Sequence, residues 1–226
     1  MVYLIFRFIC FILAKLVFRL EIRGRENIPR KGGFILASNH TSFLDPVILG
    51  VGCPRRLNFM ARSSLFRNHA FGWLLTRLNV FPLKRGEADI GALKAAMARV
   101  RKGAGLLIFP EGTRRPVVSK AEGRVESFDL GLGFDPEQSR RVEPQTNQPG
   151  DAQPGVGFLA AKLHTPVIPA FIQGTDRAMP RGVKFIHPVK VKLIFGKQIL
   201  IERGMPYRVF AGNLMKNIGH LSCSIT

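Results

Sequence analysis

A histidine and an aspartate at close spacing are the first candidates for chemistry. His40 and Asp45 lie in the stretch ASNHTSFLDPV, directly after a short apolar run. In one continuous helix their side chains would point about 140° apart, so they can meet only if His40 is in a loop and Asp45 begins the next helix. Pro46 favours this arrangement, because proline prefers the first helical position. A carboxylate that orients a histidine makes a general base, and an N-capping aspartate beside an unrelated loop histidine is the alternative.

A second polar cluster follows the apolar run LLIFP. It comprises Glu111, Gly112, Thr113 and Arg114. Gly112 allows close backbone approach, and Arg114 can bind phosphate oxygens through two hydrogen bonds. A third run, VFPL, is followed by Lys84 and Arg85. Because polar loops gather at the carboxyl ends of strands in α/β folds, we expect one cleft that holds a base, an acid and several cations. Solvated turns are the alternative for each cluster.

The elements that position these residues alternate along the chain. We expect strands at 32–38, 57–61, 80–83, 105–110, 166–172 and 189–195, and helices at 64–78, 92–103 and 155–164. Strand–helix alternation predicts an α/β domain with a layered mixed sheet and flanking helices, over residues 21–226. The segment 116–152 interrupts it, with 4 basic and 7 acidic residues and no periodicity. We interpret this segment as a mobile insertion.

The amino terminus predicts a membrane-associating helix over residues 1–20. The stretch VYLIFRFICFILAKLVF is apolar apart from Arg7 and Lys15, and its longest uncharged internal run is far shorter than the roughly 20 residues of a spanning helix. Arg7, Lys15 and Arg19 fall within about a 120° sector of a helix, which favours a helix lying in the interface with its cations at the headgroups. The basic residues that follow place it on the cytoplasmic face of the inner membrane. A cleaved signal peptide and a helix covering a soluble core are the alternatives.

The amino-acid composition limits the classes of molecule that the chain is expected to bind. The chain has 34 Lys and Arg against 15 Asp and Glu, a net charge of +19, and 46% hydrophobic residues, which exclude a disordered basic tail. Three widely spaced cysteines form neither a disulfide framework nor a metal cluster, so we expect a reducing compartment. The dispersed cations and the apolar amino terminus argue against nucleic acid and favour an anionic membrane surface and a phosphorylated substrate.

Four segments together resemble a known family. NHTSFLD, FPLKRG, FPEGTR and TPVIPAFIQGT, in this order, resemble the four sequence blocks of the glycerolipid acyltransferases, and more narrowly the PlsC family of bacterial 1-acyl-sn-glycerol-3-phosphate acyltransferases. The resemblance implies transfer of a fatty acyl group from acyl-CoA or acyl carrier protein to the free hydroxyl of a lysophospholipid, giving phosphatidic acid without a metal or other cofactor. It implies that His40 of this H-x4-D motif deprotonates that hydroxyl and that Asp45 orients His40.

The resemblance also implies substrate contacts. The residues that would bind the glycerol phosphate are Arg85, Glu111, Gly112, Thr113 and Arg114. Arg62 stands where relatives commonly have Lys and is a further candidate phosphate contact, and the strand that holds Pro169 is expected to line the acyl region. Backbone amides near His40, or Arg62, are candidate oxyanion donors. A different lysophospholipid or an aminolipid acceptor, or a non-catalytic membrane-associated scaffold, remain the alternatives.

Overall fold

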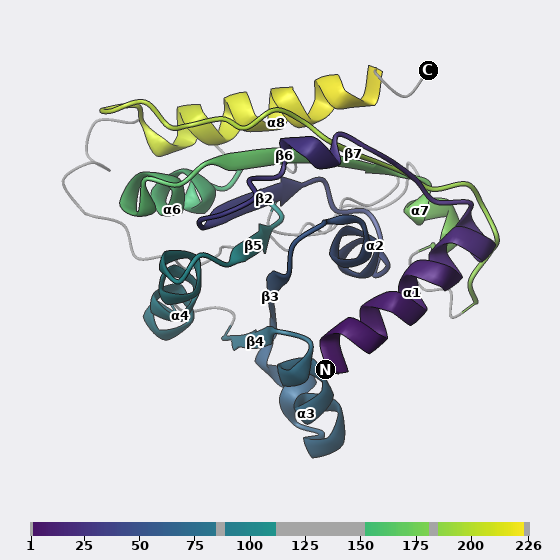
Figure 1. The fold of residues 1–226 in the computed structure, drawn as a ribbon. Coiled ribbons are helices and arrows are strands. Elements are labelled where there is room, and N and C mark those ends of the chain that lie inside the picture. Colours follow the sequence, from purple (N-terminus) through teal and green to yellow (C-terminus); the bar gives the residue numbers. More distant parts are fainter. Residues whose placement is uncertain (1, 85–88, 112–151, 181–184, 224–226) are drawn as a thin grey trace, which may run out of the picture.

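A central sheet organises the chain, which the computed structural model describes over residues 2–84, 89–111, 152–180 and 185–223 (Figure 1). Across these residues the sheet has seven strands in the order β1-β7-β6-β2-β5-β3-β4. Their bounds are β1 (Glu21–Arg23), β2 (Phe34–Ser38), β3 (Leu57–Arg62), β4 (Val80–Leu83), β5 (Gly105–Ile108), β6 (Val167–Gln173) and β7 (Lys192–Phe195). The strands from β6 to β4 are parallel, whereas β7 is antiparallel to β6. The predicted mixed sheet is confirmed.

Helices cover both faces of this sheet. They are α1 (Val2–Phe18), α2 (Asp45–Gly52), α3 (His69–Arg77), α4 (Ile90–Arg101), α6 (Gly155–Leu163), α7 (Thr175–Ala178) and α8 (Tyr207–Cys223), with 3₁₀ turns η1 (Arg25–Asn27) and η2 (Ser63–Phe66). α1 and α2 pack on one face, and α4, α6 and α8 pack on the other (Figure 1). The segment expected as one helix over 64–78 is divided into η2 and α3, because Asn68 caps α3 by accepting a hydrogen bond from the Phe71 amide.

β2 lies in the middle of the sheet and shows why a central parallel strand is apolar throughout. Phe34 and Leu36 point into the core beneath α1 and α2, whereas Ile35 and Ala37 point into the core beneath α4, α6 and α8. Successive side chains of a strand face opposite sides, so a strand covered on both faces needs apolar residues at every position. The carboxyl end of β2 therefore emerges between two packed layers.

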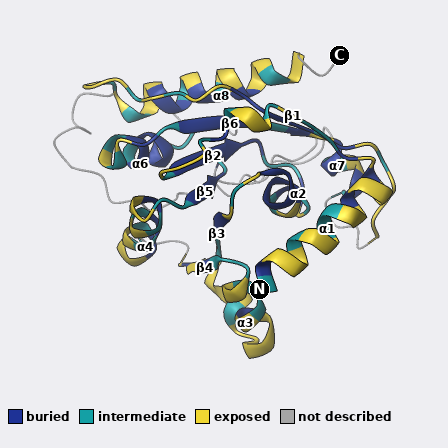
Figure 2. Ribbon diagram, in the orientation of Figure 1, coloured by how far each residue is buried: buried dark blue, intermediate teal, exposed yellow. Residues whose placement is uncertain are grey.

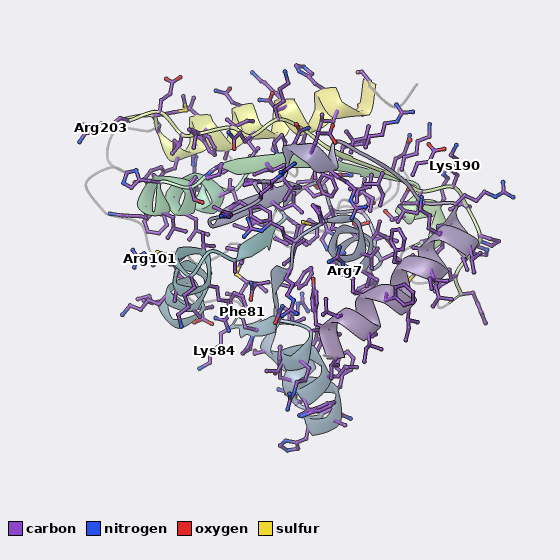
Figure 3. The ribbon with its side chains drawn as sticks, viewed as in Figure 1. Arg7, Phe81, Lys84, Arg101, Lys190 and Arg203 are labelled. Carbon is purple, nitrogen blue, oxygen red and sulfur yellow. The ribbon has the colours of Figure 1, made fainter. Side chains whose placement is uncertain are left out.

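α1 packs against the domain through one side and exposes apolar residues on the other (Figure 2). Tyr3, Ala14 and Phe18 are buried on the inner side. Arg7 departs from the expected headgroup-facing sector, because its guanidinium turns inward and donates a 2.6 Å hydrogen bond to the carbonyl of Cys53 (Figure 3). Among the helices of the described ranges, none is long and apolar enough to cross a membrane. The insertion expected at 116–152 lies outside these ranges except for Ala152.

Candidate functional site

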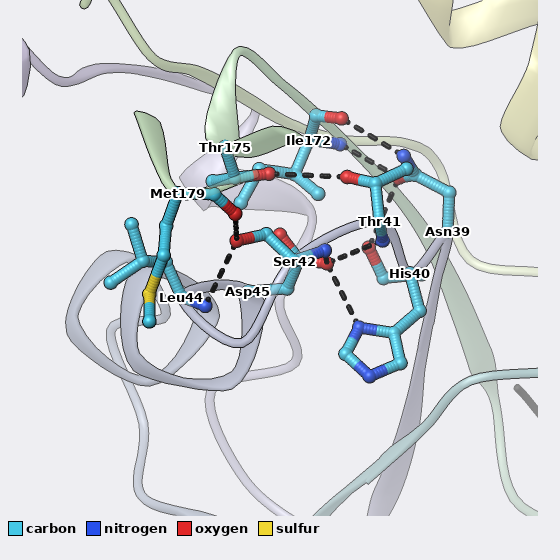
Figure 4. Close-up of polar contacts among 10 residues, drawn as sticks. Asn39, His40, Thr41, Ser42, Leu44, Asp45, Ile172, Thr175 and Met179 are labelled. Carbon is cyan, nitrogen blue, oxygen red and sulfur yellow. Dashed lines mark hydrogen bonds and ion pairs between the residues drawn. The ribbon is translucent and has the colours of Figure 1, made fainter. Parts of the chain in front are cut away.

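His40 and Asp45 meet at the carboxyl end of β2, as their spacing predicts. His40 lies in the loop after β2, Asp45 is the first residue of α2, and His40 Nδ1 is 2.9 Å from Asp45 Oδ2 (Figure 4). The same oxygen accepts hydrogen bonds from the backbone amides of Thr41, at 2.7 Å, and Ser42, at 2.8 Å. Asp45 is fully buried. The two amides hold the Asp45 carboxylate in place, and the carboxylate in turn fixes the orientation of the His40 ring.

The other side of the His40 ring is available for chemistry. When Nδ1 carries the proton that Asp45 accepts, Nε2 holds the lone pair that can take a proton from a substrate. The imidazole stacks on Phe109, which follows the neighbouring strand β5, with ring centroids 3.9 Å apart and planes 15° apart. The His40 side chain is 16% exposed. The ring is therefore clamped in orientation, yet a substrate can reach it.

Two further contacts fasten the loop to the segment after β6. The hydroxyls of Thr41 and Thr175 lie 3.3 Å apart, and Ser42 Oγ donates a 3.1 Å hydrogen bond to the carbonyl of Met179 (Figure 4). Sequence reasoning assigned no role to these four residues. The sequence does contain a signal for this contact, the fourth block TPVIPAFIQGT, which ends at Thr175. Its strand is expected in the same sheet, and loops at one edge of a sheet can support each other.

An apolar cavity of about 510 Å³ adjoins His40. Its walls come from α1, α2, η2, α3 and the three strands β3, β4 and β5. Arg7 also lines it, and Arg7 is bonded to Cys53 just beyond the last residue of α2, whereas His40 is bonded to the first residue of α2. The cavity therefore extends along most of α2, an eight-residue helix whose length is roughly 12 Å. Its dimensions suit a long apolar chain whose reactive end lies at His40.

The strand of the fourth sequence block does not reach this cavity. Pro169 lies in β6, opposite Ala37 of β2, and no residue of β6 is among the described residues that line the cavity walls. β6 adjoins β2 on the side away from β5, so β2 lies between β6 and the strands that line the cavity. The strand that holds Pro169 therefore does not line this cavity, and its expected place beside the acyl chain stays a prediction.

Cations lie at the same edge of the sheet, two strands away. Arg62 ends β3 opposite Leu83 of β4, so both exposed cations, Arg62 and Lys84, are at the carboxyl ends of neighbouring strands. Lys84 is labelled in Figure 3. Glu111 is buried just beyond β5. The expected contacts at 85 and 112–114 lie outside the described residues. Within the described ranges, no group of three His, Cys, Asp or Glu side chains could hold a metal ion.

The hydrogen bonds of Asp45 exclude two of the candidate oxyanion donors. The amides of Thr41 and Ser42, the nearest ones after His40, already donate to Asp45. An N–H group that already donates its hydrogen bond to a buried carboxylate cannot also stabilise the oxyanion of a substrate. Thr41 and Ser42 therefore leave the set of expected donors, in which Arg62 and the other backbone amides near His40 stay candidates.

Comparisons with known proteins agree with this geometry. A family model described as Acyltransferase matches residues 19–173. A chloroplastic 1-acyl-sn-glycerol-3-phosphate acyltransferase of Brassica napus is 29% identical over 187 residues, covering 80% of this chain and 45% of the relative. The enzyme of the same description from Pseudomonas aeruginosa is 37% identical over 116 residues, covering 50% of this chain and 42% of the relative. The chain thus spans less than half the length of both relatives.

A solved structure shares the fold. It is the 1-acyl-sn-glycerophosphate acyltransferase PlsC from Thermotoga maritima, which superposes with a TM-score of 0.62 at 23% identity. The match covers 95% of this chain and 79% of that protein.

Proposed function

The chain belongs to the acyltransferase family, and on that premise we propose that it transfers a fatty acyl group from a thioester to the free hydroxyl of 1-acyl-sn-glycerol-3-phosphate, producing phosphatidic acid. The observation that carries the proposal is the position of the His40–Asp45 pair beside a long apolar cavity. In the proposed complex, His40 is the base and lies beside the carbonyl end of a fatty acyl chain that fills this cavity. The relatives of that description support the acceptor.

The proposed mechanism needs no covalent enzyme intermediate. Nε2 of His40 takes the hydroxyl proton as the oxygen attacks the thioester carbon, and the carbonyl becomes a tetrahedral oxyanion. Asp45 stabilises the imidazolium that forms. The oxyanion then collapses, the carbon–sulfur bond breaks, and the thiolate takes the proton from the imidazolium. A thioester is already activated, so the proposed reaction uses no metal or resident cofactor.

The acyl chain of the donor would occupy the cavity along α2. Its walls are apolar except for a few groups such as Arg7, and each buried methylene contributes about 0.8 kcal/mol of binding. Either acyl-CoA or acyl carrier protein could present the thioester, and the exposed Arg62 and Lys84 are suited to the phosphates of the first or the acidic surface of the second.

The phosphate of the acceptor would bind to the second and third sequence blocks. We assign binding of the glycerol phosphate to Arg85, Glu111 and the turn 112–114, with Arg62 as a further candidate phosphate contact. Arg114→Lys tests the assignment, because lysine reproduces bidentate phosphate binding poorly. The KM for the lysophosphatidic acceptor should rise far more than the KM for the thioester, while slow thioester hydrolysis persists. Equal increases would make Arg114 a structural residue or a donor contact.

Membrane association through α1 completes the proposal, since the acceptor and the product are lipids. The outer side of α1 exposes nine large apolar side chains, and Lys15 and Arg19 are exposed beside it. Such a helix binds one leaflet, which would place the enzyme on the cytoplasmic face of the inner membrane. Deleting residues 2–19 should move the chain from the membrane pellet to the supernatant. A tag at residue 1 on the opposite side of the membrane from the domain would refute the one-leaflet arrangement.

A donor-by-acceptor activity panel in detergent micelles tests the proposed reaction. The donors are acyl-CoA and acyl carrier protein, and the acceptors are lysophosphatidic acid, a neutral lysophospholipid and a lyso-aminolipid. We expect turnover with lysophosphatidic acid and none with His40→Ala. Preference for another acceptor would retain the acyltransferase and change its substrate. A lack of turnover in every pairing would leave the non-catalytic scaffold.

A further inference from the structure

α3 buries very little of itself against the rest of the protein. It has nine residues, and Gly72 is its one buried position. Helices of this length are marginal in water unless an apolar face is packed. Its two large aromatic side chains are nevertheless exposed, Phe71 with 45% and Trp73 with 56% of its surface accessible. α3 therefore presents apolar surface that the described part of the chain does not cover.

The inner side of α3 is apolar as well. Phe71, Leu74 and Leu75 line the cavity that adjoins His40. The helix is thus a thin wall with the cavity on one side and Trp73 on the other, while Phe71 lies at the edge of the cavity, where it is partly exposed. On the outer side Trp73 shares one sector of the helix with the exposed His69, Thr76 and Arg77, so an aromatic ring lies in water among polar and cationic groups.

The opening of the cavity has the same character. Five side chains both line the cavity and are exposed, and we call them the rim: Phe6, Phe43, Val47, Leu65 and Phe71. They come from α1, the loop before α2, the start of α2, η2 and α3. An apolar rim is unfavourable in water and is favourable where lipid surrounds it. α1, whose exposed apolar side is proposed above to bind a leaflet, supplies Phe6 to the rim, and α3 supplies Phe71.

The charge of this region fits an anionic surface. Residues 46–86 contain seven Lys or Arg and no Asp or Glu. Arg67 and Arg77 lie on either side of Trp73 in the sequence and are exposed, and the guanidinium of Arg77 is 5.3 Å from the centroid of the Trp73 indole ring. Tryptophan beside arginine is typical of the boundary between headgroups and acyl chains, where the ring is partly immersed and the cation meets lipid phosphates.

We propose that α3 is a second lipid-contacting element, which inserts Trp73 and Phe71 into the headgroup boundary of an anionic bilayer. With α1 on the same membrane, the rim would lie in lipid, and the cavity would exchange acyl chains directly with the bilayer. This inference rests on the membrane association proposed for α1 and extends it. The occupant is a lipid surface, because the exposed groups are aromatic and cationic and no carboxylate is present between residues 46 and 86.

Trp73 reports on this proposal without any mutation, because it is the one tryptophan of the chain. The full chain is mixed with vesicles of phosphatidylcholine and phosphatidylglycerol. We expect the tryptophan emission to shift to the blue, acrylamide quenching to fall, and lipids with a doxyl group near the headgroup to quench. The shift should weaken with salt and with phosphatidylcholine alone. If the chain sediments with vesicles while Trp73 stays accessible to acrylamide, the role of α3 is refuted and that of α1 stands. If it does not sediment, both are refuted.

A pair of variants adds an independent readout. Trp73→Ser should weaken vesicle binding roughly tenfold and lower activity on vesicle-borne acceptor. The variant loses the favourable free energy of transferring the aromatic side chain from water into the bilayer. Trp73 is not among the residues that line the cavity, so turnover of a soluble short-chain acceptor should be retained. Val209→Ser is the matched control, since Val209 is 50% exposed on α8, which covers the other face of the sheet. Equal vesicle binding by the two variants would contradict the proposal.

Discussion

The side-chain amide of Asn39 replaces a strand backbone at the end of the β2–β6 ladder. Asn39 Nδ2 donates to the carbonyl of Ile172, and Asn39 Oδ1 accepts from the Ile172 amide, each at 2.9 Å. The last backbone pair of this ladder is Ser38 with Ala170. The side chain thus satisfies both backbone groups of Ile172 where β2 ends, and the main chain is free to turn toward His40 (Figure 4).

Asn39→Ala should therefore impair the chemical step. The change leaves two buried backbone groups of Ile172 without their partner, at a cost of about 1–3 kcal/mol each in stability. It also releases the residue that precedes His40, so we expect kcat to fall about tenfold or more while both KM values stay close to those of the wild type. Steady-state kinetics with each substrate varied in turn, at a temperature where the variant is folded, provide the measurement.

Asn58 offers a matched control for that prediction. It is also a buried asparagine, in β3, and its Nδ2 donates to the carbonyl of Gly105 at 3.2 Å. This contact, at the start of β5, lies away from the catalytic loop. Asn58→Ala should lower the melting temperature without a matching fall in kcat. If the two variants lost kcat equally, the effect of Asn39 would be one of stability alone.

His40→Ala should abolish most acyl transfer and leave the fold in place. Loss of a general base typically lowers the rate about 10²–10⁴-fold. The loop should keep its shape, because Asp45 Oδ2 still accepts from the amides of Thr41 and Ser42. Turnover and the thermal unfolding curve of the purified variant test both statements together. Turnover near that of the wild type would remove His40 from the mechanism.

The alternation of elements and the His40–Asp45 pair could be predicted because local patterns determine them. β2 reads as FILAS and is buried at every position, which is what a central parallel strand requires. Asp45 precedes a proline, and that proline marks the start of α2. Both features depend on neighbours within a few residues, so a single sequence contains them.

The remaining features depend on distant contacts. The periodicity of α1 places Arg7, Lys15 and Arg19 in one sector but does not indicate which side of the helix faces the domain. The hydrogen bond from Arg7 to Cys53, 46 positions away, shows that Arg7 faces the domain. Thr175 reaches Thr41 across 134 positions. β1 has three residues, too few for a recognisable alternation, and it forms because β7 provides a partner. No local pattern records such pairings.

Asp89 should stabilise the domain in a pH-dependent way. Its carboxylate accepts hydrogen bonds from the amides of Lys84, at 2.8 Å, and Ala92, at 2.9 Å, and these bonds lower the pKa of Asp89. A group whose pKa is lower in the folded state adds stability above its unfolded pKa, and this is lost as the pH falls. Asp89→Ala should cost about 1 kcal/mol at neutral pH, as for other helix caps. Urea unfolding should show the difference shrinking below about pH 4. A difference independent of pH would refute the role of the charge.

Gly50→Leu should shift the donor preference toward shorter acyl chains. Gly50 lines the cavity from α2, and a Cβ there would lie 3.1 Å from the ring of Phe59, which also lines the cavity and would have to shift. The leucine must therefore occupy cavity volume. Excluding two methylenes, each contributing about 0.8 kcal/mol, would lower kcat/KM for a long-chain thioester roughly tenfold and leave a short-chain thioester nearly unaffected.

Gly212→Leu is the control for this change, because Gly212 lies on α8 and a Cβ there meets no atom within 4 Å. It adds the same side chain to a helix without entering the cavity, so its ratio of long-chain to short-chain kcat/KM should equal that of the wild type. The measurement is kcat/KM for a series of acyl thioesters of increasing length with each variant. A uniform loss across the series in Gly50→Leu would mean that the substitution disturbs α2, and with it Asp45. An unchanged series would mean that the acyl chain binds elsewhere.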